Sequence, residues 1–118
     1  MLNNKTIYIT VNHLDDFNTT YTFRPNDILK LKKDHNNCYD DEAITAYSKH
    51  NYKCGYVANS VGTVARGTYS AGRAYDQFEE EIYCVVRFII EDFMICELID
   101  EDAEEYDVAE IENRVFAK

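Results

Sequence analysis

Short segments in which apolar and polar residues alternate recur along most of the chain. Alternation over about four to eight residues is typical of a β-strand with one buried face, whereas a helix repeats its apolar positions about every 3.6 residues. Several segments are followed by turn-forming residues, and one such turn, 24–27, contains the only proline. The pattern predicts a mainly β chain that closes into a small barrel or a folded sheet.

The alternation predicts about seven strands, mostly linked by short turns. They cover residues 5–11, 21–23, 28–32, 43–47, 53–57, 81–90 and 93–99. The last two are joined by Glu91-Asp92 and are predicted to form a hairpin. Gly55 interrupts an otherwise β-prone segment, which indicates either a close backbone approach or an unusual φ at this residue.

Two short helices are expected in the middle of the chain, where the alternation stops. The first, ending at about residue 66, follows a cap at Asn59-Ser60, and the second, 71–78, follows a cap at Thr68 or Ser70. They would form a short helical insert between the strands.

The last residues differ from the rest in composition. With 118 residues there is room for one core, so we expect one domain over 1–99 and an acidic tail over 100–118. Val108, Ile111 and Val115 have the spacing of a helix with one apolar stripe. Such a helix could pack on the barrel, or the tail could act as an acidic flap that competes with phosphate.

No apolar run approaches the ~20 residues needed to cross a bilayer, and the first residues lack the apolar stretch of a signal peptide. We therefore expect a cytoplasmic protein without a membrane partner. The four cysteines contain no CxxC pair, so we expect reduced thiols, no bound metal and no cofactor.

Charge is unevenly distributed along the chain. Residues 1–43 carry −2 and residues 76–118 carry −12, whereas residues 44–75 contain no acid and carry +4. The total of −10 argues against a general nucleic-acid coat, because phosphate attraction supplies most non-specific binding. The acid-free window 44–75 is predicted to be a local anion site.

Catalytic motifs are poor. Ser60 and Ser70 lack the context of a nucleophile elbow, and GTVARG is not a phosphate-binding loop. The adjacent acids 40–42 could bind a divalent ion, but hydrogen-bond acceptors at a loop boundary are the commoner role. The sequence therefore predicts a binding module rather than an enzyme.

Tyrosines are abundant around the acid-free window, and the chain has ten of them with no tryptophan. Rings interleaved with lysine and arginine suit single-stranded nucleic acid, whose bases stack while cations hold the phosphates. Tyr47 and Tyr56 occupy alternating positions and are expected to line barrel faces. For the loop residues Tyr39, Tyr52 and Tyr69, stacking and lining are equally open.

The segment 36–44, NNCYDDEAI, resembles the HIRAN domain family, which reads N-x-x-D-x-x-A-I before a strand. Gly55-Tyr56-Val57 is similar to the family's next element, and 27–31 is similar to the strand before the Asn-rich loop. Residues 63–68 and 70–73 resemble the helical insert of stand-alone bacterial members. The resemblance covers about 8–98.

The resemblance implies an OB-like barrel that recognises single-stranded DNA ends, with Tyr39 and Asp40 at the positions that hold the terminal nucleotide. The chain departs from helicase-type members at 13–16 and at Ala58-Asn59, where those members carry cations. We therefore expect a small OB-like or SH3-like barrel that binds nucleic acid. The predicted nucleic-acid-binding residues are Tyr39, Asp40, Lys49, Lys53, Asn59, Arg66 and Arg73.

No catalytic or metal-binding residue is predicted. The alternative to nucleic-acid binding is an acidic protein-interaction adaptor, or a nucleic-acid mimic without catalytic activity. Either alternative would act through residues 76–118.

Overall fold

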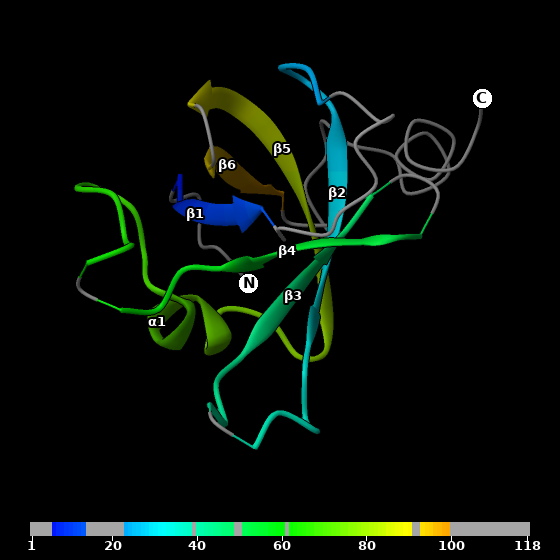
Figure 1. Ribbon diagram of the computed structural model, residues 1–118, viewed down its shortest axis with the longest axis vertical. Coiled ribbons are helices and arrows are strands. Elements are labelled where there is room, and N and C mark those ends of the chain that lie inside the picture. The colour runs from blue at the N-terminus through cyan, green and yellow to red at the C-terminus, as the bar shows by residue number, and fades with distance from the viewer. Residues whose placement is uncertain are drawn as a thin grey trace.

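A computed structural model of the chain describes residues 6–13, 23–38, 40–48, 51–60, 62–90 and 93–99. Six strands in this part of the chain close an antiparallel barrel in the order β1-β4-β3-β2-β5-β6 (Figure 1). The elements are β1 (Tyr8–His13), β2 (Ile28–Lys33), β3 (Ile44–Tyr47), β4 (Lys53–Val57), α1 (Ala71–Tyr75), β5 (Glu81–Ile90) and β6 (Phe93–Ile99). The prediction of a mainly β chain forming a small OB-like barrel is confirmed.

The core fills the barrel interior with side chains from alternate strand positions. Ile9 and Val11 of β1 and Leu29 and Leu31 of β2 all belong to this core, and all four are fully buried. Complete burial of such a side chain stabilises the fold by about 1.5–3 kcal/mol. The apolar positions of the alternating pattern are therefore the positions whose side chains point into the barrel.

Part of the barrel wall is apolar on its outer face as well. Ile28, Tyr83, Val85 and Ile99 form a second buried cluster, separate from the interior. They come from β2, β5 and β6, and the register places Ile28 opposite Val85 and Tyr83 opposite Ile99. β2 and the first half of β5 therefore have apolar residues on both faces.

The proline turn leads into β2 as predicted. Asp27 donates its backbone N–H to the carbonyl of Arg24 (3.1 Å), and its carboxylate accepts from the Arg24 N–H (2.9 Å). Pro25 presets its own φ, while Asn26 has φ 77°. A positive φ after proline is typical of a type II turn, in which asparagine is tolerated at that position.

The predicted strand over 21–23 was wrong at its only described residue. Phe23 is buried but belongs to no strand, and residues 21 and 22 lie outside the described part of the chain. The Phe23 ring joins the core from the segment before the turn. The apolar side chain of Phe23 therefore reflects its place in the core and not a place in a strand.

The first predicted helix was also wrong, because its backbone donors go elsewhere. Thr63 and Val64 both donate to the carbonyl of Ser60 (3.0 Å each), which completes a single turn. The next donor, Ala65 N–H, binds the hydroxyl of Thr10 on β1 (3.1 Å) instead of continuing a helix. Gly67 then adopts φ 90° in a following turn.

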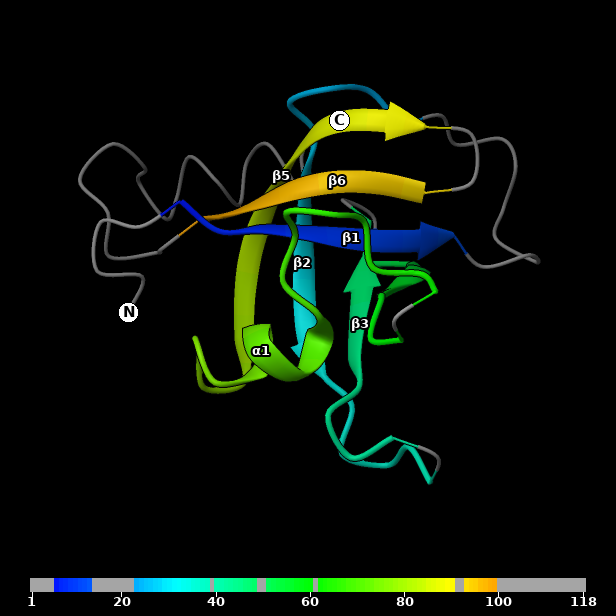
Figure 2. The same cartoon turned by 90° about the vertical axis from the view of Figure 1, so that its left-hand side faces the viewer.

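The second predicted helix is α1, and it is shorter than expected. Ser70 caps it, with its hydroxyl accepting from the Arg73 N–H (3.3 Å), and the helix ends at Tyr75 rather than 78. Ala71 and Ala74 are fully buried against the barrel core. Figure 2 shows α1 at the lower end of the barrel, in front of the lower parts of β5 and β2.

No helix within the described ranges is long and apolar enough to cross a membrane. The predicted tail or terminal helix over 100–118 lies outside those ranges.

Candidate nucleic-acid interface

The residues predicted to bind nucleic acid are distributed over several parts of the barrel. Tyr39 and Lys49 lie outside the described residues. Asp40 precedes β3 and Asn59 follows β4, while Lys53 begins β4. Arg66 is exposed in the segment between β4 and α1, and Arg73 is exposed on α1. The structure brings some of these residues together and separates others.

Asp40 and Asn59 are joined directly. The Asn59 side-chain amide donates to one Asp40 carboxylate oxygen (3.0 Å), and its carbonyl oxygen accepts from the Gly72 N–H of α1 (2.8 Å). The other Asp40 oxygen accepts from the Glu42 N–H (2.9 Å). One Asp40 oxygen therefore links the loop to Asn59, which in turn binds α1, while the other closes a turn within the loop.

Arg73 stacks on an aromatic ring beside this network. Its guanidinium carbon lies 3.8 Å from the centroid of the Tyr69 ring. The Tyr69 backbone N–H donates to the Tyr8 carbonyl (2.7 Å), which fixes the ring's position next to β1. A guanidinium stacked in this way keeps its planar edge available to an anion.

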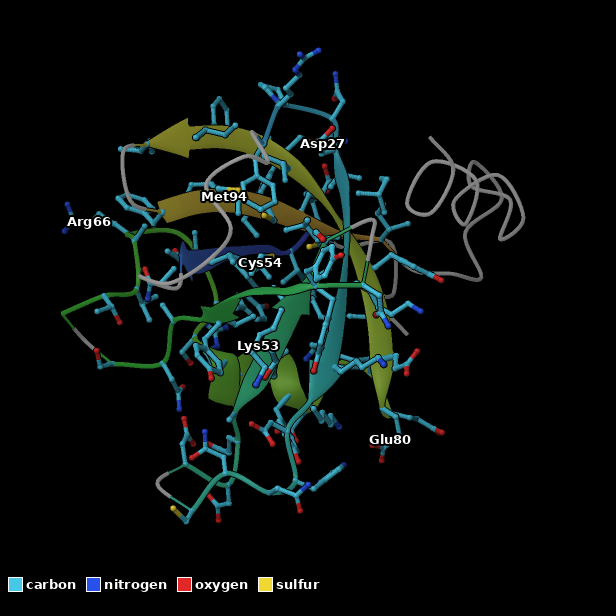
Figure 3. All side chains as sticks on the ribbon, turned by 45° about the vertical axis from the view of Figure 1, so that its right-hand side comes forward. Asp27, Lys53, Cys54, Arg66, Glu80 and Met94 are labelled. Atoms are coloured by element: carbon cyan, nitrogen blue, oxygen red, sulfur yellow. The ribbon has the colours of Figure 1, made fainter. Side chains whose placement is uncertain are left out.

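Two described cations of the acid-free window, Lys53 and Arg66, lie apart on the molecule. Lys53 starts β4, which runs for about 13 Å before the segment that carries Arg66 begins. Figure 3 shows the labelled Lys53 and Arg66 side chains on separate parts of the molecule. The contiguous window in sequence is therefore divided between two regions of the surface.

A different group of residues brings lysine and tyrosine side by side on the outer face of β2, β3 and β4. The register places Lys30 beside Tyr47, and Tyr47 beside Lys53. One step along the strands, Lys32 lies beside Thr45 and Thr45 beside Tyr56. We call this the lysine–tyrosine face, and its members are Lys30, Lys32, Tyr47, Lys53 and Tyr56.

Each lysine of this face has an aromatic ring within reach. The ammonium of Lys32 lies 5.1 Å from the Tyr47 ring centroid, and that of Lys53 lies 5.9 Å from the Tyr56 ring. Lys30 lies 5.7 Å from the ring of Tyr83 on β5. Lys32 also approaches Glu81 at 3.8 Å, which supplies an acid at the border of the face.

The next lysine of β2 has a different role. Lys33 donates to the Phe78 carbonyl (2.8 Å), and its ammonium lies 4.1 Å from the Tyr75 ring centroid. These contacts tie β2 to α1 and the segment after it. Lys33 is therefore a structural cation, although the sequence ILKLKK does not distinguish it from its neighbours.

Lys30 and Lys32 are not among the predicted binding residues, because they lie outside the continuous acid-free window 44–75. The available signal was their spacing in β2, where Lys30 and Lys32 alternate with Leu29 and Leu31. That alternation assigns both lysines to the outer face. Their proximity to Lys53 depends on strand order, which local patterns do not contain.

The described residues include no group of three or more His, Cys, Asp or Glu side chains that could hold a metal ion. His35 forms a 2.7 Å pair with Glu80, and this hydrogen bond lowers the pKa of the Glu80 carboxyl. Cys38 is exposed nearby, whereas Cys54, Cys84 and Cys96 are buried in the barrel.

Within the described residues, the fold defines a class: a closed, six-stranded antiparallel barrel with an OB-like form and one short helix. No protein-family model, curated protein or solved structure matches this chain.

Proposed function

We propose that this barrel binds single-stranded nucleic acid across the lysine–tyrosine face. The observation that carries the proposal is the row Lys53–Tyr47–Lys30, in which the strand register sets a tyrosine between two lysines on neighbouring strands. Outer strands spaced about 4.8 Å apart place the two lysines roughly 10 Å apart. A base can stack on the ring while the flanking ammonium groups meet the phosphates.

Local charge supports this face despite the protein's net charge of −10. Coulomb interactions between exposed charges are screened beyond about 8–10 Å at physiological salt, so nearby lysines dominate at short range. The acids elsewhere oppose long-range attraction of a polyanion. Binding is therefore expected to be weak and to favour low salt.

The HIRAN resemblance supports the same class of ligand and adds a preference for a strand end. The loop that contains Tyr39 and Asp40 is the part of the sequence that carries this implication. In the structure, the Asp40–Asn59 hydrogen bond (3.0 Å) positions that loop. A linear strand is then expected to bind more tightly than a circular one of equal length.

The test compares two charge reversals of equal size. Lys30→Glu with Lys53→Glu alters the lysine–tyrosine face, and Arg66→Glu with Arg73→Glu alters the other region. Fluorescence anisotropy of a labelled oligothymidylate of about ten nucleotides at low salt measures the affinity. We expect the lysine reversal to abolish binding, because each reversed side chain repels a phosphate. The arginine reversal should weaken binding less than threefold.

Salt dependence gives a second measurement on the parent protein. If Lys30, Lys32 and Lys53 each meet one phosphate, log affinity should fall against log salt with a slope of about −2. Thermal melting of both double variants checks that they remain folded. Binding lost only in the arginine variant, or no binding by the parent at high micromolar protein, would contradict the proposal.

A further inference from the structure

The distal part of the β5–β6 hairpin exposes apolar side chains. Phe88 is 61% exposed, Ile90 45% and Ile89 38%, although they are consecutive residues of one strand. Phe93, half-buried, lies opposite Ile90 on β6. We call Phe88, Ile89, Ile90 and Phe93 the hairpin patch.

The backbone of this part of β5 has one open edge among the described strands. Its pairing with β2 runs from Glu81 to Val85, and Val86 exchanges hydrogen bonds with the turn residues Asn26 and Asp27 (2.7 and 2.8 Å). The strand then continues to Ile90, paired with β6 on its other side. In Figure 2 this end of β5 forms the border of the layer that also contains β6 and β1.

A bulge accompanies the change from a closed wall to an open edge. The β5–β6 register shifts between Val86 and Phe88, so Arg87 is the additional residue. Arg87 bonds Glu97 on β6 (2.9 Å) and the Asn26 side chain (3.1 Å). The Arg87 side chain is therefore held back toward the barrel, and Phe88, Ile89 and Ile90 are uncharged.

An edge strand with exposed apolar residues and no charge is a template for another strand. Natural proteins usually protect such an edge with lysine, proline or a covering element. We propose that the β5 edge over 87–90 binds an extended peptide segment of a partner protein by strand addition. The partner segment has alternating apolar residues flanked by basic ones.

A second copy of this chain fits the edge less well. From their exposed fractions and the size of such side chains, Phe88, Ile89 and Ile90 can together bury about 300 Å² in one molecule. A symmetric dimer would then bury about 600 Å² through them, below the ~1,200 Å² of stable interfaces. Two copies each carrying −10 also repel, whereas a basic segment is attracted.

A synthetic peptide of alternating threonine and valine, with two lysines at each end, provides a defined probe. Fluorescence anisotropy of the labelled peptide measures binding to the full chain. We expect the parent protein to bind the peptide saturably. The double variant Phe88→Lys with Ile90→Lys should bind it at least tenfold more weakly, because edge lysines oppose strand addition and repel the basic peptide. Tyr52→Lys is the matched control, since Tyr52 is also an aromatic residue with 61% exposure, and it should leave the affinity within twofold.

A second probe tests the mode of binding. The same peptide N-methylated on alternate amides loses one row of backbone donors, so its affinity should also fall at least tenfold. Equal binding of both peptides, equal binding by the Phe88/Ile90 variant, or no binding by the parent overturns the proposal. A concentration-dependent dimer of the parent that the Phe88/Ile90 variant lacks would overturn it in favour of a second copy.

Discussion

Gly55 of β4 lies tightly against the backbone of β1. A Cβ added at this residue would fall 2.1 Å from the backbone carbonyl oxygen of Asn12 and 3.2 Å from a methyl group of Val11. A backbone oxygen cannot move aside as the end of a side chain can. The sequence predicted either a close approach or an unusual φ here, and the structure confirms the close approach.

Replacing Gly55 with alanine should separate β1 from β4 and destabilise the barrel. We expect the free energy of unfolding to fall by about 1–3 kcal/mol, the usual cost of overpacking. The melting temperature should fall by about 4 °C or more. Gly62→Ala is the control, because a Cβ there meets nothing within 4 Å. A Gly55→Ala protein that melts with the parent would show that the two strands do not need this contact.

At the scale of elements, Asn59 connects three of them. Its side chain bonds Asp40 in the loop before β3 and the Gly72 N–H of α1, while its backbone follows β4. Asn59→Ala removes two hydrogen bonds, each of which contributes about 0.5–1.5 kcal/mol. We therefore expect the free energy of unfolding, measured by urea denaturation, to fall by about 1–3 kcal/mol.

Ser60→Ala is the control for this change. Ser60 is adjacent, but its hydroxyl bonds that of Thr63 at the exposed surface (2.8 Å) and neither Asp40 nor α1 within the described part of the chain. Hydrogen exchange of the Gly72 amide should accelerate in Asn59→Ala and remain unchanged in Ser60→Ala. If exchange were equal in the two variants, Asn59 would not be what fastens α1 to the loop.

The strands were predictable because their determinants are local. The ranges 53–57, 81–90 and 93–99 were predicted with the bounds that the structure has, since alternation and β-branched residues act within each segment. The helix after Asn59 failed because Thr10, more than fifty residues away in sequence, takes the Ala65 N–H. The lysine–tyrosine face required knowing that β3 lies between β2 and β4. This strand order depends on contacts between distant segments, so it cannot be read from any one of them.

At the scale of the whole molecule, the closed barrel controls the chemistry of its thiols. Cys54, Cys84 and Cys96 are fully buried, whereas Cys38 is exposed on a loop. Burial raises the pKa of the Cys54 thiol from 9.0 to about 12, and the neighbouring Cys96 adds to the shift. Burial and a hydrogen bond with Cys96 raise the pKa of Cys84 well above 9.0. The Cys54 and Cys84 thiols therefore stay protonated in the folded barrel at pH values where the thiols of an unfolded chain ionise.

The sign of the resulting pH dependence follows from proton linkage. Below pH 9 both states keep the Cys54 proton, so the thiol contributes nothing to the slope. Between pH 9 and about 12 the unfolded state loses this proton and the native state keeps it, so stability falls as pH rises. The free energy of unfolding falls by about 1.4 kcal/mol per pH unit for each such thiol.

Urea denaturation under reducing conditions at pH 8 and pH 10 should therefore show a smaller alkaline loss of stability in Cys54→Ala than in the parent. A Cys54→Ala slope equal to the parent's would refute the linkage. Reaction with a thiol reagent at pH 8 provides an independent check: one cysteine, Cys38, should react quickly in the native protein, and all four should react after unfolding, because only unfolding exposes the barrel interior.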